Sequence, residues 1–213
     1  MSENLNHRYS DKEERLNVVT HGFGMFMSVI GFFFLISKSS AYSGFWNKAS
    51  FVIYGISMIV LYAASTFYHA AKNPSLRRKL NIFDHAAIYV LIAGSYSPFC
   101  IVVLNNTFGW YMFLFVWFCA LLGVILKLFF TGRFDKISTA LYLLMGWQVM
   151  FFIKPIMNNL PMEGLYYLLA GGIAYTLGAI LYSISRIPYN HAVFHVFVLL
   201  GSFFHFVTIF FYI

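Results

Sequence analysis

Histidines in apolar surroundings are the residues of this sequence best suited to chemistry. An ionisable side chain inside a membrane is costly to bury and is therefore a functional candidate by default. Of the seven acids, only Asp84 lies at the boundary of an apolar run and beside a histidine. Six of the seven histidines lie in or at the edge of such runs: His21, His69, His85, His191, His195 and His205.

The spacing of two histidines suits metal binding. His191 and His195 are four residues apart, which places their β-carbons about 5–6 Å apart on one face of a helix and lets both rings bind one ion. Ser65 and His69 repeat the spacing in another apolar run. A histidine pair alone is a weak signal, whereas a third histidine from a second helix makes it much stronger.

Three histidines and one open position form the arrangement of a catalytic zinc site, in which water is the fourth ligand. His69, His191 and His195 are the three candidate ligands. Asp84 could bind the water directly or hold it by a hydrogen bond. The residue types therefore predict a zinc site with an acid beside its water.

Each of the other polar residues also has a purely structural interpretation. Ser65 could bond its own helix backbone, as serine in membrane helices often does. Asp84 could be a solvated acid or the N-cap of a helix, a position that favours aspartate. His21 and His85 could lie at the headgroup boundary, or they could support the ligands from outside. These alternatives stay open.

His205 lies ten residues beyond His195, which is about 15 Å along a helix that rises 1.5 Å per residue. It cannot share an ion with His195 at that distance. We expect His205 to bond another helix or to line a cavity.

The elements that position these residues must be membrane helices. Hydrophobic residues make up 61% of the 213 positions and charged residues only 10%, against about a quarter charged in a soluble domain. A span needs about 20 apolar residues, and continuous rather than alternating runs exclude a barrel. Seven runs qualify, at about 19–37, 50–71, 85–104, 109–130, 137–157, 163–184 and 191–213.

We therefore expect an all-α integral membrane protein, with a polar tail at 1–18 and a bundle of seven transmembrane helices at 19–213. Eleven of the fourteen basic residues fall on the side that holds the tail, and only Lys38, Lys48 and Lys154 fall on the other. The positive-inside rule then predicts a cytoplasmic N-terminus and an outside C-terminus. The histidines of four runs converge near the cytoplasmic face.

The charge distribution argues against nucleic acid as a partner, although the net charge is +7. The basic residues lie in short loops and form no continuous patch. Such residues more often set topology or contact anionic lipid headgroups. The first apolar run lacks the form of a cleavable signal peptide and is expected to remain as an anchor.

The sequence resembles the hemolysin III branch of the progestin and adipoQ receptor family over nearly its whole length, from Glu14 to Tyr212. The resemblance rests on four segments: Glu14 to Gly22, Ser65-Thr-Phe-Tyr-His69, Asp84 to Phe99, and His191-Ala-Val-Phe-His195 with Gly201 to Phe206. It implies seven spans with the N-terminus inside. Together the motifs are highly specific.

The resemblance also implies roles. In adiponectin receptors the matching histidines bind zinc and the matching aspartate contacts it through water. Carried over, the ligands are His69, His191 and His195, and Asp84 and Ser65 are the catalytic candidates. Bacterial members often have Glu after the first histidine of the last motif, where this chain has Ala192. That change removes the general base of a His-Glu-x-x-His metalloprotease and leaves Asp84 as the only acid expected nearby.

Three functions follow from these observations. Alkaline ceramidases, more distantly similar, hydrolyse a lipid amide at a like site, so a zinc-dependent hydrolase of a membrane lipid amide or ester in the plasma membrane is favoured. Zinc would lower the pKa of bound water and polarise a carbonyl, and Asp84 would take the proton. The alternatives are a non-enzymatic sensor or regulator of membrane lipids with structural zinc, and a cytolysin. The oligomeric state stays open.

Overall fold

The computed structural model describes residues 9–132 and 134–213, and in these ranges it contains helices and turns but no strand. Seven helices are long and apolar enough to cross a membrane, which confirms the predicted fold class. Two basic residues that contributed to the predicted orientation, Arg8 and Arg133, lie outside the described residues, as does the first part of the predicted tail.

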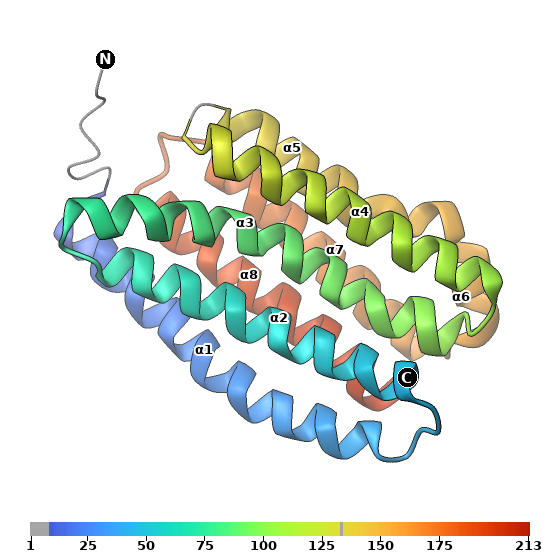
Figure 1. Ribbon diagram of the computed structural model, residues 1–213. Coiled ribbons are helices and arrows are strands. Elements are labelled where there is room, and N and C mark those ends of the chain that lie inside the picture. The colour runs from blue at the N-terminus through green and yellow to red at the C-terminus, as the bar shows by residue number, and fades with distance from the viewer. Residues whose placement is uncertain (1–8, 133) are drawn as a thin grey trace.

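The spans follow one another with short connections (Figure 1). Four of them are single helices: α1 (Asp11–Ser39), α2 (Phe45–Ala70), α4 (Thr107–Phe130) and α7 (Met162–Ser183). Two end in a π-helical turn: α3 (Pro74–Pro98) with Phe99–Val103, and α8 (Asn190–Val207) with Thr208–Tyr212. The fifth combines α5 (Asp135–Gly146), a 3₁₀ segment (Trp147–Phe152) and α6 (Ile153–Asn159).

Two helices begin earlier than the apolar runs indicate. Ser10 caps α1 by accepting a hydrogen bond from the backbone N–H of Glu13. Acidic residues fill the first turn of the helix, where their negative charge interacts favourably with the helix dipole. Asn73 caps α3 in the same way, with Pro74 in the first turn. Polar turns therefore extend both helices beyond their apolar parts.

The buried face of α1 carries small and polar residues in place of large apolar ones. Its outer face exposes Phe26 and Phe33, with 60% and 65% of their surface accessible. Small residues let membrane helices approach closely, while lipid surrounds the large ones. The buried residues follow a spacing of four and three: Asn17, His21, Gly24, Ser28, Gly31 and Leu35.

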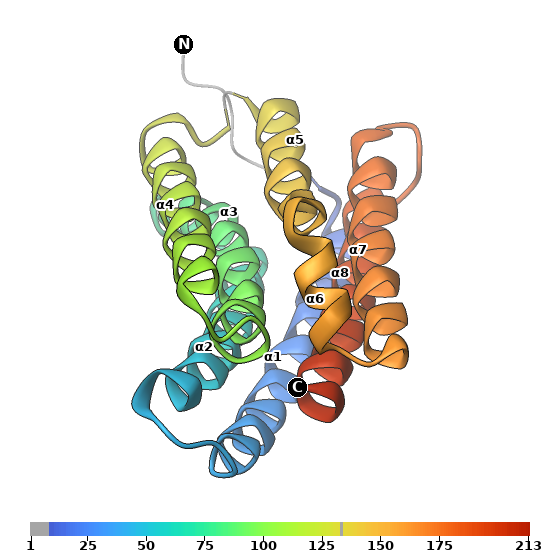
Figure 2. The ribbon, with the colours of Figure 1, turned by 90° about the vertical axis from the view of Figure 1, so that its right-hand side faces the viewer.

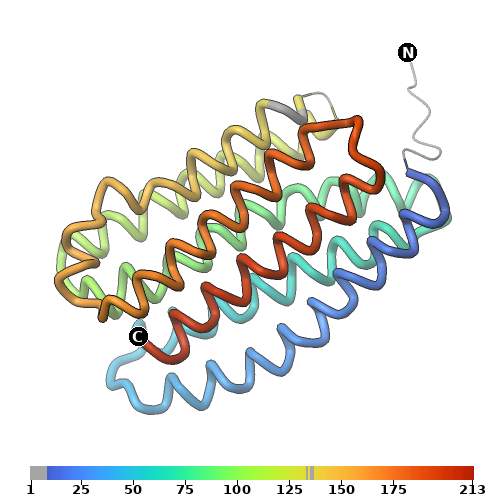
Figure 3. The backbone as a smooth tube through the Cα atoms, turned by 180° about the vertical axis from the view of Figure 1, so that it is seen from behind, coloured from blue at the N-terminus to red at the C-terminus, as the bar shows by residue number. Residues whose placement is uncertain are grey.

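The helices α1, α2, α3, α5, α7 and α8 contact one another in turn around the bundle, and α4 packs on the outside of α3, which is the most buried of the spans. α1 lies against both α2 and α8, so helices from the two ends of the chain are neighbours. Figure 2 shows α3 and α4 on one side of the bundle and α5, α6 and α7 on the other. The end at which α1 begins is called the N-terminal end of the bundle, and the chain finishes at the opposite end (Figures 1 and 3).

The fifth span is interrupted where a continuous helix was expected. Pro155 lies in the first turn of α6, and proline has no N–H to bond back to the preceding turn and its ring clashes with the carbonyl there. The 3₁₀ segment Trp147–Phe152 precedes it. The hydroxyl of Tyr96 stabilises the break by donating to the carbonyl of Gly146 at 2.6 Å and accepting from the N–H of Val149 at 2.9 Å.

Candidate metal centre

Three histidines meet at the N-terminal end of the bundle. His69 lies in the last turn of α2, and His191 and His195 lie in the first turns of α8. The Nε2 atom of His191 is 3.0 Å from that of His69 and 3.0 Å from that of His195. All three side chains are buried, and each offers a ligand atom within 4.8 Å of the other two. Of the histidines expected to converge, the structure brings these three together as a group that could hold a metal ion.

The neighbour of His69 determines which of its ring nitrogens carries a proton. Its Nδ1 lies 2.7 Å from Oε2 of Glu14, and a carboxylate accepts hydrogen bonds, so Nδ1 holds the proton of the neutral ring. The lone pair of His69 is therefore on Nε2, the atom that faces the other two histidines.

The same reasoning applies to His195. Its Nδ1 is 3.2 Å from Oγ1 of Thr20, and that hydroxyl already donates to the carbonyl of Leu16 at 2.8 Å. The threonine oxygen therefore accepts from Nδ1–H of His195, which leaves the second lone pair on Nε2. At His191 the hydroxyl of Tyr9 lies 3.2 Å from Nδ1, and the two rings stack with centroids 4.7 Å apart.

This arrangement of protons suits a metal ion. Two lone pairs, on His69 and His195, point at Nε2 of His191 from 3.0 Å. One proton on Nε2 of His191 can bond only one of these two lone pairs. A cation, in contrast, can accept a lone pair from each of the three nitrogens. In metal sites each ligand imidazole also gives its other N–H to an acceptor. The three histidines therefore fit a three-nitrogen metal site.

One face of α1 packs against the triad. Glu14, Asn17, Thr20 and His21 occupy neighbouring turns of this helix. The Asn17 amide is 3.4 Å from Nδ1 of His69. The ring of His21 stacks on His195 with centroids 3.4 Å apart, and its two nitrogens have no hydrogen-bond partner among the described residues. His21 therefore packs directly against a candidate ligand.

The predicted acid and hydroxyl line the cavity next to the histidines. Asp84 and Ser65 share a cavity of about 420 Å³ with His191 and His195. Asp84 lies inside α3, eleven positions after the cap at Asn73, so it is not an N-cap. Ser65 Oγ is buried and has no hydrogen-bond partner among the described residues, so it does not bond its own helix. Both groups face a space open to a ligand or water.

His85 and His205 line the same cavity but are not part of the triad. His85 Nδ1 donates to the carbonyl of Asn81 at 2.8 Å, and Tyr142 donates to the carbonyl of His85 at 2.9 Å. His205 lines the same cavity farther along α8, with its ring edge-on to Tyr175 at 5.4 Å. The expectation that His205 lines a cavity outside the metal site is confirmed.

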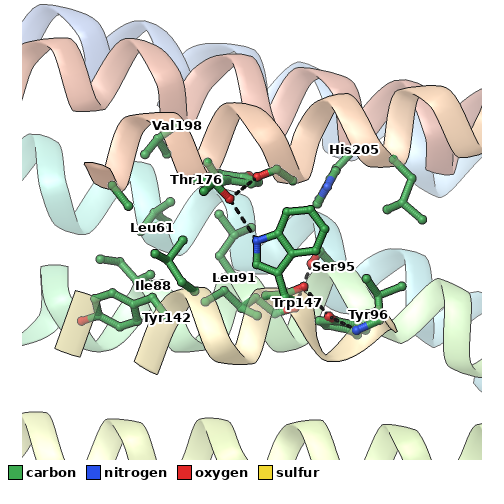
Figure 4. A pocket seen from close by; sticks show the side chains of 18 of the residues that line it. Leu61, Ile88, Leu91, Ser95, Tyr96, Tyr142, Trp147, Thr176, Val198 and His205 are labelled. Carbon is green, nitrogen blue, oxygen red and sulfur yellow. Dashed lines mark hydrogen bonds between the residues drawn. The ribbon is translucent and has the colours of Figure 1, made fainter. Parts of the chain in front are cut away.

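The rest of the cavity is largely apolar. Figure 4 shows Leu61, Leu91 and Val198 along its walls and the indole of Trp147 lying across it. The indole N–H donates to Oγ1 of Thr176 at 3.0 Å, so the polar atom of the ring is satisfied within the wall. A cavity of this kind suits an apolar chain.

Five residues that sequence reasoning did not place at the site contact its histidines or the partners of those histidines: Tyr9, Glu14, Asn17, Thr20 and Arg77. The expectation that Asp84 is the only nearby acid is wrong, because Glu14 bonds a ligand ring. Its signal was the spacing of Glu14, Asn17 and His21, three and seven residues apart, which places polar groups on one helical face. The predicted boundary of the tail at residue 18 separates Glu14 and Asn17 from His21 and so divides this face between two regions.

Comparisons with known sequences match nearly the whole chain. The family described as haemolysin-III related matches residues 9–206. Hemolysin-3 of Bacillus cereus is 42% identical over 202 residues, which cover 95% of this chain and 92% of that protein. The Hemolysin-3 homolog of Bacillus subtilis (strain 168) is 42% identical over 204 residues, 96% of each chain.

A more distant relative is human. The monocyte to macrophage differentiation factor of Homo sapiens is 30% identical over 203 residues, 92% of this chain and 83% of that protein. No solved structure matches the chain. The bacterial and human relatives both cover the region that holds the three histidines.

Proposed function

Because the chain is a multi-pass membrane protein that belongs to the haemolysin-III-related family, we propose that it is a zinc-dependent hydrolase of a membrane lipid amide or ester in the plasma membrane. The observation that carries the proposal is the convergence of three imidazole Nε2 atoms, with lone pairs assigned by their outer partners, beside a largely apolar cavity. The ligands would be His69, His191 and His195.

The side chains around the triad can divide the work of hydrolysis. Zinc held by three imidazoles would supply an activated water and a polarised carbonyl. Asp84 would accept a proton as the general base. Ser65, whose hydroxyl is buried without a described partner, can donate a hydrogen bond to the carbonyl oxygen of the substrate. Ala192 follows His191 and offers no group for proton transfer.

The cavity explains why the substrate would be a lipid. Its apolar walls can hold an acyl chain, and its lining also includes Asp84, Ser65, His191 and His195. An amide or ester carbonyl at the head of such a chain would lie next to these groups. Membrane lipids are therefore the proposed partners.

The test uses purified protein in lipid nanodiscs loaded with one equivalent of zinc. A panel of labelled ceramides and acyl lipids should include a substrate from which the protein releases fatty acid. Asp84→Ala should lower the rate at least about 100-fold, the lower limit for loss of a general base, while retaining zinc. Glu163→Gln, an exposed acid at the start of α7, is the control and should leave the rate unchanged. Equal rates for wild type and Asp84→Ala contradict the role of Asp84.

A structural zinc is the second candidate, because the ligands come from α2 and α8, which are far apart in the chain. An ion there would hold these two helices together. In that case the zinc-loaded protein would turn over no lipid in the panel, and the fourth coordination position would not exchange with added azide in a cobalt-substituted sample. The relative named Hemolysin-3 adds a third arm. Lysis of erythrocytes by the pure His191→Ala protein would favour a lytic function independent of metal.

A further inference from the structure

The structure places a carboxylate and an arginine in series behind one candidate ligand. Glu14 of α1 contacts Nδ1 of His69 at 2.7 Å through Oε2. Its other oxygen, Oε1, forms an ion pair with the guanidinium of Arg77, which lies in the first turns of α3. The chain of contacts runs from a helix start, through an acid on a second helix, to a ligand on a third.

Arg77 also holds the backbone on which His69 stands. Its Nη1 donates to the carbonyls of Tyr68 and Ala71, both at 3.3 Å. These carbonyls belong to the end of α2, where a cation complements the helix dipole. The guanidinium lies over the ring of Tyr68, 4.7 Å from its centroid. Arg77 therefore restrains His69 in two ways: it bonds the backbone carbonyls on either side of His69, and it holds Glu14, which contacts the ring.

The three side chains of this chain of contacts are largely removed from water. The side chain of His69 is fully buried, and those of Glu14 and Arg77 are only 13% and 16% exposed. A carboxylate removed from water in this way needs partners for its oxygens. It has one on each: a ring N–H and a guanidinium. Such a carboxylate is held in one position and cannot easily turn to solvent.

We propose that Glu14, held by Arg77, is the positioning residue of the metal centre: it keeps the His69 ring turned with Nε2 toward the ion. A charged acceptor on the outer N–H fixes the tautomer of a ligand histidine and makes its inner nitrogen a better donor. The inference rests on the metal-binding part of the proposed function and adds a second acid to the site. Asp84 would move protons, whereas Glu14 would act only through His69.

The test measures zinc affinity by competition with a fluorescent chelator in detergent-solubilised full-length protein. Glu14→Ala should weaken binding by about 10–100-fold, the usual cost of removing such a partner. Glu14→Gln keeps the size and one acceptor oxygen but loses the charge, so its zinc affinity should lie between those of wild type and Glu14→Ala. Arg77→Gln should weaken binding less than Glu14→Ala. The controls are Glu163→Gln and Arg78→Gln, both exposed, which should match wild type.

A spectroscopic readout separates positioning from a general effect on folding. Cobalt bound in place of zinc should show a visible absorption band that shifts in Glu14→Ala and partly returns in Glu14→Gln, while the controls keep the wild-type band. If Glu14→Ala fails to fold, the isosteric Glu14→Gln carries the test alone. Zinc affinity and cobalt band in Glu14→Gln identical to wild type would overturn the inference.

The outcomes also separate this inference from the proposed function. If wild type binds zinc, His191→Ala does not, and both Glu14 variants match wild type, only the role of Glu14 fails. If wild type binds no zinc, the metal centre and the role of Glu14 fail together. Weaker binding in the Glu14 variants, with lipid hydrolysis absent throughout, supports the positioning role and leaves the zinc structural.

Discussion

The candidate metal centre and the cavity wall beside it are built in opposite ways. At the centre, helices α1, α2, α3 and α8 meet through direct polar contacts, and His69, His191 and His195 are at most 6% exposed. Of the most apolar stretch of each of these four spans, 28%, 56%, 72% and 33% of the residues are buried, in chain order. The fifth span, which forms much of the wall, has only 17% buried and is interrupted by a 3₁₀ segment.

The difference separates two demands on one bundle. A metal site tolerates little displacement of its ligands, so their rings are held by partners such as Glu14 and Thr20. An apolar chain needs space and few directional hydrogen bonds. The cavity beside Trp147 has this space and is lined mainly by apolar side chains. Variants in the two regions should therefore affect different properties of the protein.

The largest effect is expected at a ligand. His191→Ala removes the imidazole that lies 3.0 Å from both other ligand nitrogens. Zinc affinity should fall by more than the roughly 100-fold that loss of an outer partner can cost. Elemental analysis after gel filtration measures the zinc retained. The matched change in the other region, Trp147→Ala, should leave the zinc content unchanged, and zinc retained by His191→Ala contradicts the assignment.

A smaller effect is expected where α1 packs closely on its neighbours. A β-carbon at Gly24 would lie 2.6 Å from Tyr62 and 2.7 Å from Leu199. Tyr62 cannot yield easily, because it is buried and donates to Oγ of Ser202 at 2.7 Å. Gly24→Ala should therefore lower the free energy of unfolding by about 1–3 kcal/mol, measured by thermal unfolding in detergent.

Two glycines provide controls for that change. A β-carbon at Gly22 would lie 3.8 Å from Thr66, and one at Gly146 in the fifth span meets nothing within 4 Å among the described residues. Both alanine variants should be neutral or stabilise the protein by up to about 1 kcal/mol, the helix preference of alanine over glycine. A loss at Gly146 equal to that at Gly24 would mean that the two regions are packed alike.

The smallest effect is expected in the cavity wall. Trp147→Ala removes the indole that lies across the cavity (Figure 4). The added space should shift the preference between long and short acyl chains by about tenfold, within the range that small changes of an apolar pocket produce. Competition between two labelled lipids measures this ratio. An unchanged preference would place the acyl chain elsewhere.

The spans were predictable because lipid requires long apolar runs, but their ends were not. The run that begins at residue 85 belongs to a helix that begins at Pro74, and the run at 19 belongs to one that begins at Asp11. Capping by Asn73 and Ser10 extends both helices through polar sequence. Hydropathy does not detect such turns, so Asp84 was considered as a helix start and Glu14 was assigned to the tail.

The histidine triad was predictable for a different reason. The spacing of His191 and His195 defines one helical face, and the alternating direction of successive spans brings His69 to the same end. The partners that orient these rings come from α1 and α3, and their contacts depend on how four helices pack together. The spacing of Glu14, Asn17 and His21 indicates one polar face of α1 but not which rings this face meets, and Arg77 has no periodic signal in the sequence. The sequence therefore predicts the meeting of the three candidate ligands, but not the contacts that Glu14, Thr20 and Arg77 make around them.

The most direct test of the central claim is X-ray absorption at the zinc edge of the purified, zinc-loaded protein. Three imidazoles should give nitrogen neighbours at about 2.0–2.1 Å, with the multiple-scattering pattern of histidine rings. That signal should be lost in His191→Ala. A sulfur shell at about 2.3 Å, or a spectrum identical in wild type and His191→Ala, would contradict a centre formed by His69, His191 and His195.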